Sequence, residues 1–362
     1  MANQIPVTIL TGFLGAGKTT LLNRLLRSDT ASRTLVIINE FGSIGIDHNL
    51  VMFSADESSV IALSSGCLCC TIRGDLTKTL REAPWRFARD GKRWFDQVII
   101  ETTGLADPAP IIQTLFAEPS VASQYELIQL ITVVDSVNAI NTLQAQPEAS
   151  KQVAVADTIV VSKTDLVNLK QRDAVRTRLK SLNPAAKLVV DNPSQIDPEQ
   201  IFGVSKFNPT AKTLDVQQWL SLDAYAPPMA PAHDHDHPHD QNRHGEQIRS
   251  VCLSFAEPKP IRLFEAWFDY LTRMRGSNLL RIKGILNVSE LEVPMVIHGV
   301  QHIWHPPEIL PAWPDEDRQS RVVFILRDLE KSDLLNALKF ITDQVKNVQT
   351  TGLPPAKPFN DT

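Results

Sequence analysis

Near its amino terminus the chain reads Gly12-Phe13-Leu14-Gly15-Ala16-Gly17-Lys18-Thr19-Thr20, which fits the phosphate-binding loop pattern G-x-x-x-x-G-K-[ST]. The apolar run at 7–10 predicts a buried strand before this loop, and leucines at 21, 22, 25 and 26 predict a helix with one apolar face after it. The glycines let successive backbone N–H groups point at phosphate oxygens, and the helix N-terminus adds partial positive charge. A glycine turn without a ligand is the alternative, which these flanks disfavour.

The loop therefore predicts a site for a nucleoside triphosphate. We expect Lys18 to reach the β- and γ-phosphates and the Thr19 hydroxyl to bind Mg(II). The nucleotide contacts would come from Gly12, Gly15, Ala16, Gly17, Lys18, Thr19 and Thr20.

A second acidic residue near Mg(II) is expected at the end of a neighbouring strand. Residues 97–104 read Gln-Val-Ile-Ile-Glu-Thr-Thr-Gly, so Glu101 ends an apolar strand and Gly104 would allow close approach to the γ-phosphate. Because glutamate is longer than the commoner aspartate, its contact with Mg(II) could run through water. The alternative is an acidic residue that only ends the strand.

The sequence Ser162-Lys163-Thr164-Asp165 follows an apolar run at 159–161 and predicts guanine recognition. The Asp165 carboxylate would accept hydrogen bonds from guanine N1–H and the N2 amino group, a pair that adenine does not offer. The stem of Lys163 would lie over the base, and Ser162 is a shorter substitute for the commoner asparagine. The alternatives are a plain turn at a strand end, or an ATP-dependent kinase in which Asp165 does not read the base.

Three of the four cysteines, Cys67, Cys69 and Cys70, lie within four residues. Three thiolates can occupy three corners of a tetrahedral Zn(II) site and leave the fourth open, which suits delivery better than permanent structure. Soft sulfur also suits Cu(I), and Co(II) or Ni(II) stay open. If backbone strain prevents all three from binding one ion, two would bind and a distant group would complete the site. Redox chemistry and inert buried thiols are the alternatives; Cys252, alone in a strand, is expected in the core.

Other candidate residues are histidines and acids. Histidines alternating with aspartates predict weak capture of divalent metal by a flexible segment, with a merely solvated linker as the alternative; they are His233, His235, His237, His239 and His244. Residues 39–48 hold glycines and acids typical of a loop that senses the γ-phosphate, in which Asp47 or Glu40 could position water or Mg(II). His48 lies in the same segment and could be a ligand, whereas His298, His302 and His305 fall on strand-like sequence, where ordinary surface or core positions are expected.

Apolar runs alternate with helical stretches through the first half of the chain. The runs are mostly β-branched and continuous, which is typical of a parallel sheet; they lie at 7–10, 35–38, 60–63, 98–100, 127–134, 159–161 and 188–190. Helices are expected at 75–82, 110–116 and 171–182. The pattern predicts a doubly wound, mostly parallel α/β phosphate-binding-loop domain over 1–222.

The composition changes after that domain. A His-rich flexible linker is expected at 223–247, a smaller α+β domain at 248–349 and a tail at 350–362. In the smaller domain the pattern predicts strands at 248–255, 279–288, 293–297 and 322–326, and helices at 262–275 and 332–345.

The net charge of -5 and pI of about 6.0 give no sign of a partner among nucleic acids or membrane surfaces. The chain starts Met1-Ala2-Asn3-Gln4 without a basic segment, and no run approaches the roughly 20 apolar residues of a membrane span. We therefore expect a cytoplasmic location and reduced thiols.

Taken in order, these motifs resemble the CobW-type family of metal-handling P-loop GTPases. The matching segments are 12–20, 39–42, 66–74, 101–108 and 162–165, and a His-rich linker followed by a small C-terminal domain is also typical. One position departs from the family pattern: Ser43 stands where many members carry a glutamate that some use to bind metal. The expected metal site therefore depends on the cysteines.

The resemblance implies a slow GTPase, converting GTP and water to GDP and phosphate, that handles Zn(II) or another transition metal close to the nucleotide. The catalytic residues would be Lys18, Thr19, Glu101 and Asp47. We expect a metallochaperone that binds Zn(II) at the Cys-x-Cys-Cys motif and delivers it to a client metalloprotein, with a homodimer as a further expectation. The alternative is a metal storage protein whose GTPase activity is incidental.

Overall fold

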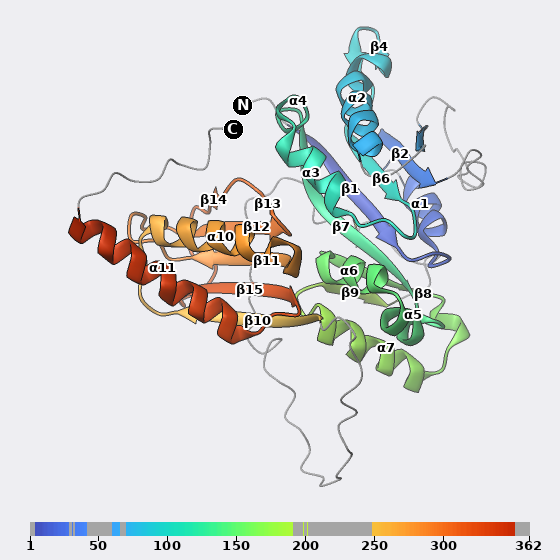
Figure 1. Ribbon diagram of the computed structural model, residues 1–362. Helices are drawn as coiled ribbons and strands as arrows, with labels where there is room; N and C mark the ends of the chain where they lie inside the picture. The colour runs from blue at the N-terminus through green and yellow to red at the C-terminus, as the bar shows by residue number, and fades with distance from the viewer. Residues whose placement is uncertain are drawn as a thin grey trace.

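The computed structural model describes residues 4–28, 31, 33–41, 60–65, 70–190, 198, 201 and 248–351, with the side chains of 39–41, 60–65, 70–73 and 346–351 left aside. A seven-stranded sheet forms the amino-terminal part of the molecule, and a six-stranded sheet forms the carboxyl-terminal part (Figure 1). The expected linker at 223–247 lies outside the described residues.

The first sheet has the strand order β3-β2-β6-β1-β7-β8-β9, and its neighbours pair in parallel. Every strand expected in this part of the sequence is present: β1 (Ile5–Gly12), β2 (Thr34–Phe41), β3 (Val60–Ser65), β6 (Gln97–Thr102), β7 (Tyr125–Asp135), β8 (Thr158–Ser162) and β9 (Lys187–Val190). Because all the strands run the same way, their carboxyl ends meet at one edge of the sheet. The phosphate-binding loop lies at that edge, directly after β1.

Helices cover both faces of this sheet, and α1 is the one that follows the loop. Their bounds are α1 (Lys18–Leu26), α2 (Cys70–Arg86), α3 (Ala109–Ala117), α4 (Pro119–Ala122), α5 (Ala139–Ala145), α6 (Pro147–Val155) and α7 (Leu169–Leu182). Leu21, Leu22 and Leu25 of α1 are buried in one apolar cluster, and helices α2, α3, α6 and α7 contribute to the cluster on the other face. The doubly wound architecture is therefore confirmed. A short hairpin, β4 (Ala88–Arg89) with β5 (Lys92–Arg93), was not expected, and neither were α4, α5 and α6.

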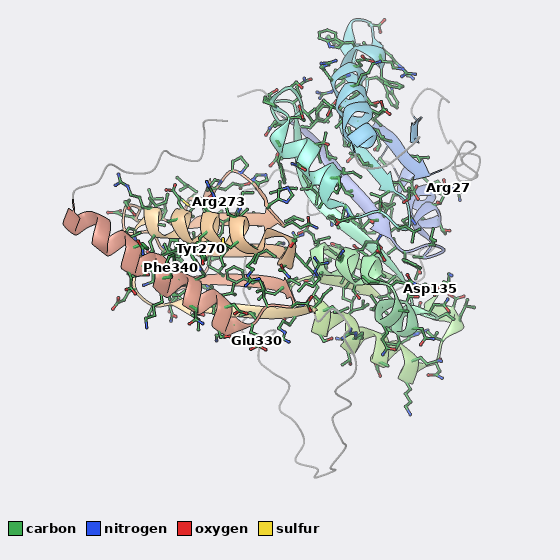
Figure 2. The ribbon with its side chains drawn as sticks, viewed as in Figure 1. Arg27, Asp135, Tyr270, Arg273, Glu330 and Phe340 are labelled. Atoms are coloured by element: carbon green, nitrogen blue, oxygen red, sulfur yellow. The ribbon has the colours of Figure 1, made fainter. Side chains whose placement is uncertain are left out.

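The second sheet pairs its strands antiparallel in the order β10-β15-β11-β12-β13, with β14 also on β12. Its elements are β10 (Ile248–Phe255), α10 (Ile261–Arg275), β11 (Leu279–Leu286), β12 (Met295–Val300), β13 (Ile303–Trp304), β14 (Glu308–Ile309), β15 (Ser320–Arg327) and α11 (Lys331–Thr351). Tyr270 of α10 faces Phe340 of α11, with ring centroids 5.5 Å apart (Figure 2). The helices and long strands expected here are confirmed. Among the described helices, none is long and apolar enough to cross a bilayer.

Cys252 does not belong to the core, and the expectation that it would is wrong. Val251, Leu253 and Phe255 of β10 point into the apolar cluster under α10, so Cys252, between them, faces the other way and is only half-buried. Partial burial raises the pKa of its thiol, because the charged thiolate is disfavoured away from water.

The apolar core continues from one domain into the other. Leu280, Val300, Ile303 and Ile325 of the second sheet belong to the cluster that β1, α3 and α6 of the first domain form. Helix α3 lies against β13, α6 against β11, and α7 against β10. The contacts between the domains are therefore apolar as well as polar, and such contacts favour the docked arrangement.

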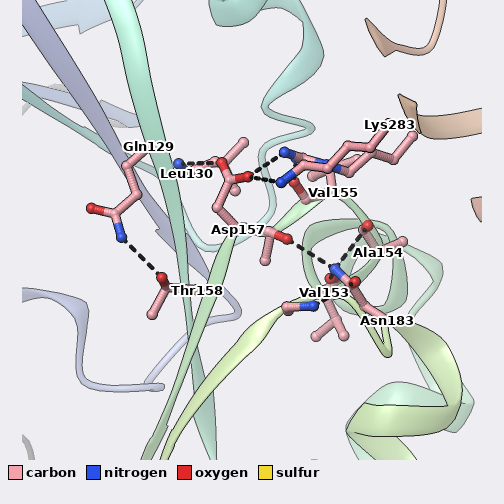
Figure 3. A network of polar contacts seen from close by, with 12 residues as sticks. Gln129, Leu130, Val153, Ala154, Val155, Asp157, Thr158, Asn183 and Lys283 are labelled. Atoms are coloured by element: carbon pink, nitrogen blue, oxygen red, sulfur yellow. Dashed lines mark hydrogen bonds and ion pairs between the residues drawn. The ribbon is translucent and has the colours of Figure 1, made fainter. Parts of the chain in front are cut away.

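Asp157, at the turn into β8, is the centre of a polar network across this interface (Figure 3). Its carboxylate pairs with Arg281, accepts from Lys283 Nζ at 2.8 Å and accepts from Leu130 N at 3.0 Å, while Arg281 also donates to the Val155 carbonyl. Burial alone would raise the pKa of Asp157, but Arg281 and Lys283 hold it well below its usual range. The Asp157 carboxylate therefore compensates part of the positive charge of Arg281 and Lys283 where the domains meet.

Candidate nucleotide-binding site

The loop between β1 and α1 has a backbone that glycines make possible. Gly12 has φ of +142°, and a Cβ there would lie 2.3 Å from the Val133 carbonyl oxygen. Lys18 Nζ donates to the Gly12 carbonyl at 3.0 Å and lies 3.5 Å from that of Phe13. The ammonium group is therefore held over the loop, whose curved backbone is suited to phosphate oxygens.

Thr19 and Glu101 meet beside this loop. The Thr19 hydroxyl donates to Glu101 Oε1 at 3.2 Å, and Glu101 is 3% exposed. A hydroxyl and a carboxylate in contact are hard oxygen donors, which Mg(II) prefers. These two residues therefore fit the Mg(II) that accompanies a nucleotide, and they are far apart in sequence but adjacent in the fold.

The segment after Glu101 packs directly on the loop. A Cβ at Gly104 would lie 2.5 Å from Leu14 N, so only glycine allows this approach. The side-chain amide of Gln152 donates to the carbonyls of Gly104 at 3.2 Å and Ala106 at 3.0 Å. The Thr103 hydroxyl is buried and has no hydrogen-bond partner among the described residues. A buried polar group without a partner is expected where a ligand supplies the missing hydrogen bond.

The residues expected to recognise the base, 162–165, differ in their burial and in their contacts. The Ser162 hydroxyl lies 2.6 Å from the Ala16 carbonyl and 3.2 Å from that of Val134, so it ties β8 to the loop. Lys163 has a left-handed backbone with φ of 56°, and Asp165 is exposed in the short 3-10 helix Thr164–Leu166. Of these, Asp165 has its carboxylate available to solvent and to a base, and direct contact with guanine stays a prediction for all of them.

Asp135, the last residue of β7, is a polar group at this edge that the sequence did not single out (Figure 2). It accepts from Lys163 Nζ at 2.8 Å, from Asn138 Nδ2 at 2.8 Å and from Val137 N at 2.8 Å. Burial would raise the pKa of Asp135, but these hydrogen bonds outweigh it and lower the pKa below its ordinary value. Asp135 therefore holds the Lys163 ammonium group at the carboxyl end of β7. Its place at the end of an expected strand was the signal that could have identified it.

The other expected site residues lie outside the described part of the chain, and they are Asp47, Cys67, Cys69, His233, His235, His237 and His239. Cys70 is described only by its backbone, as the first residue of α2. Strand β3 ends at Ser65 with Phe41 of β2 beside it, at the same edge of the sheet as the loop. Three strand intervals separate β3 from β1, which is about 14 Å at the usual strand spacing.

Two family models match this chain. The model for the CobW/HypB/UreG nucleotide-binding domain matches residues 6–190, and the model for the cobalamin synthesis protein cobW C-terminal domain matches residues 248–341. The two matches coincide with the two sheets and their helices.

Individual relatives match over nearly the whole length. The zinc chaperone YjiA of Escherichia coli is 30% identical over 332 residues, covering 92% of this chain and 97% of the relative. The zinc chaperone CobW of Pseudomonas aeruginosa is 30% identical over 366 residues, covering 93% and 91%. The crystal structure of Zn(II)-bound YjiA GTPase from E. coli superposes with a TM-score of 0.65 at 26% identity, covering 94% of this chain and 99% of that one.

Proposed function

The chain belongs to the CobW family of P-loop GTPases, and from this premise we propose that it hydrolyses GTP and uses the hydrolysis to release Zn(II) to a client metalloprotein. Relatives that match across both domains are named zinc chaperones, and the solved structure of one contains Zn(II). The observation that carries the proposal is that β3, β6 and β1 end at the same edge of one sheet. The cysteine segment follows β3 in the sequence, Glu101 lies in β6, and the phosphate-binding loop follows β1.

The loop would hold GTP by its phosphates. Backbone N–H groups and Lys18 would bind the β- and γ-phosphates, and Asp165 would select guanine while Lys163, fixed by Asp135, covers the base. Thr19 and Glu101 would hold Mg(II), which neutralises charge that develops on the phosphates during transfer to water. Asp47 would position that water, so that the γ-phosphate leaves as inorganic phosphate and GDP remains.

Hydrolysis would act on the cargo through the segment 102–108. The Gly104 backbone lies against the loop and the neighbouring Thr103 hydroxyl is buried without a hydrogen-bond partner among the described residues, so this segment would respond to the loss of the γ-phosphate. The thiolates of Cys67, Cys69 and Cys70 would bind Zn(II) in the GTP state, with Co(II) or Ni(II) as other ions that this donor set accepts. In the GDP state the thiolates would separate and the ion would pass to the client. The histidines at 233–239 would raise the local metal concentration.

The test is the Zn(II) affinity of the full chain measured by competition with a chelator, once with a non-hydrolysable GTP analogue and once with GDP. We expect tighter binding with the analogue by at least about 10-fold, and linkage then requires Zn(II) to tighten binding of the analogue by the same factor. Serine at Cys67, Cys69 and Cys70 should abolish the difference, whereas deletion of 233–244 should lower metal capacity and leave it intact. Equal Zn(II) affinity in the two nucleotide states would contradict the proposal and favour a storage protein.

A further inference from the structure

Three potential metal ligands meet at the end of β7 that lies farthest from the nucleotide edge. They are Glu126 of β7, His305 after β13 and Glu308 of β14, each partly buried. A ligand atom from each, a ring nitrogen or a carboxylate oxygen, lies within 4.8 Å of the other two. Glu126 comes from the GTPase domain and the other two residues come from the C-terminal domain, so the group spans the interface between the domains.

The backbones that carry these residues are fixed by the two sheets. Glu126 lies beside Pro6 in the β1–β7 ladder, and Glu308 lies beside Val296 in the β12–β14 ladder. His305 N donates to the His298 carbonyl at 3.0 Å, which extends the pairing of β12 with β13 by one residue. Sites built on paired strands hold their ligands more closely than sites on loops. Any movement needed to close the group around an ion therefore falls on the side chains.

The ring of His305 is oriented by two neighbours. Its Nδ1 lies 2.9 Å from the Pro306 carbonyl oxygen, which can only accept, so Nδ1 carries the proton in this contact. The ring also meets Phe116 of α3 edge to face, with centroids 5.1 Å apart. With the proton on Nδ1, the lone pair is on Nε2. Around a bound metal an imidazole usually donates one N–H to a carbonyl and binds the ion through its other nitrogen, so Nε2 is the nitrogen of His305 that would bind an ion.

The donor set defines the kind of ion. One imidazole nitrogen with two carboxylates suits Zn(II) with water in the fourth position, whereas Mg(II) and Ca(II) prefer oxygen alone. Ligand atoms around tetrahedral Zn(II) are about 3.3 Å apart at bonds of about 2.05 Å. The side chains would therefore move inward by about 1 Å from their present separation.

We propose that Glu126, His305 and Glu308 form a second Zn(II) site, which joins the GTPase domain to the C-terminal domain. The ion would stabilise the docked arrangement because it binds ligands from both sides of the interface. This site is separate from the cysteine motif and does not depend on nucleotide. The competing account is a plain ion pair between a protonated His305 and Glu308, whose Nδ1 and Oε1 are 4.0 Å apart.

The test uses the full chain with serine at the three clustered cysteines and alanine at the five linker histidines, so that other expected Zn(II) ligands are gone. Zn(II) binding is measured against a chromophoric chelator with GDP present, and the melting temperature is followed with and without Zn(II). We expect one equivalent of Zn(II) and a rise in melting temperature when it binds. Glu126→Gln, His305→Ala and Glu308→Gln should each weaken binding at least about 10-fold and remove the rise.

His302→Ala is the matched control, because His302 is exposed in the same hairpin and lies outside the group. It should leave binding and the melting shift unchanged. Glu126→Gln keeps the shape of the side chain and so tests the site even if His305→Ala fails to fold. No Zn(II) uptake by the parent protein, or equal uptake by Glu126→Gln and Glu308→Gln, would overturn the proposal. A lower melting temperature of His305→Ala without Zn(II), combined with an unchanged Zn(II) shift, would establish the ion pair instead.

Discussion

The two ends of β7 carry two different kinds of site. At the carboxyl end, Asp135 holds Lys163 beside the phosphate-binding loop; at the amino end, Glu126 meets His305 and Glu308. Nine residues separate Glu126 from Asp135 along the strand, which is about 30 Å in extended backbone. The first site is built from local motifs of one domain and the second from single residues of two. If both proposals hold, β7 serves a nucleotide at one end and joins the domains at the other, and substitutions at one end should leave the other end unchanged.

Lys18→Ala should have the largest effect, and only at the carboxyl end. Loss of the ammonium group from the phosphates should lower GTP hydrolysis by about 10²–10³-fold, because a preorganised charge stabilises the transferring phosphoryl group. Phosphate release at saturating GTP measures this. Lys170→Ala, an exposed lysine on α7, is the control and should keep full activity. Activity in Lys18→Ala within threefold of the parent would mean that the loop is not the catalytic site.

Asp157→Asn should weaken the interface between the GTPase domain and the C-terminal domain. It leaves the buried cations Arg281 and Lys283 without their carboxylate, which typically costs about 3 kcal/mol. Urea unfolding would show the loss, and Asp173→Asn, at an exposed position of α7, should change stability by less than about 0.5 kcal/mol. An unaltered unfolding free energy in Asp157→Asn would show that the network does not hold the domains.

The same carboxylate gives a pH dependence with a definite sign. The pKa of Asp157 is lowered in the folded state by Arg281 and Lys283, which with His298 are the charged or titratable groups around it in the described structure. Its contribution is therefore complete above the unfolded pKa of about 3.9 and is lost as the pH falls below that value. Unfolding free energies at a series of pH values from about 5 downward should fall less steeply in Asp157→Asn than in the parent. Parallel curves would contradict this assignment.

Asp165→Asn should weaken the preference for guanine by about 10²-fold, because two hydrogen bonds to a charged group are replaced by a mismatched amide. The ratio of kcat/KM for GTP to that for ATP measures the change within one protein, so ATP is the internal reference. A ratio unchanged by the substitution would assign base recognition elsewhere.

Gln301→Ala should have the smallest effect. Gln301 Nε2 donates to Asp107 Oδ2 at 3.1 Å and is the contact between the C-terminal hairpin and the segment 102–108. One partly exposed hydrogen bond is worth about 0.5–1 kcal/mol, so unfolding should shift by that amount. Gln319→Ala, which removes an exposed glutamine of the same domain, is the comparison and should shift less. A loss above about 2 kcal/mol would mean that Gln301 contributes more than this one hydrogen bond.

The parallel strands and the phosphate-binding loop could be predicted because their signals are local. Continuous β-branched runs and one nine-residue motif are enough for β1 and α1. Helix α6 was missed because polar Ser150 and Gln152 are on its buried side, where Ser150 donates to Leu143 O and Gln152 to the loop segment. Such residues interrupt the apolar pattern that predicts a helix.

Contacts between residues far apart in the sequence could not be predicted from the hydrophobic pattern. Arg281 and Lys283 stand in β11, whose residues are all buried, and they are stable there because Asp157 lies across the interface. In the same way His305 read as an ordinary strand histidine until the fold brought Glu126 to it. The contact of Asp135 with Lys163 could not be predicted either, because it depends on the register of β7 and β8, which pairs Asp135 with Ser162.

The coupling between GTP hydrolysis and Zn(II) release can be tested most directly in a single turnover. The protein is loaded with Zn(II) and GTP, and phosphate release and Zn(II) transfer to a chelator are then followed together. We expect one equivalent of Zn(II) to leave at the rate of phosphate release, and we expect no release with a non-hydrolysable analogue. A second equivalent, held by Glu126, His305 and Glu308, should stay bound through the turnover. Release of the first equivalent at the same rate with the analogue as with GTP would contradict the coupling between hydrolysis and metal.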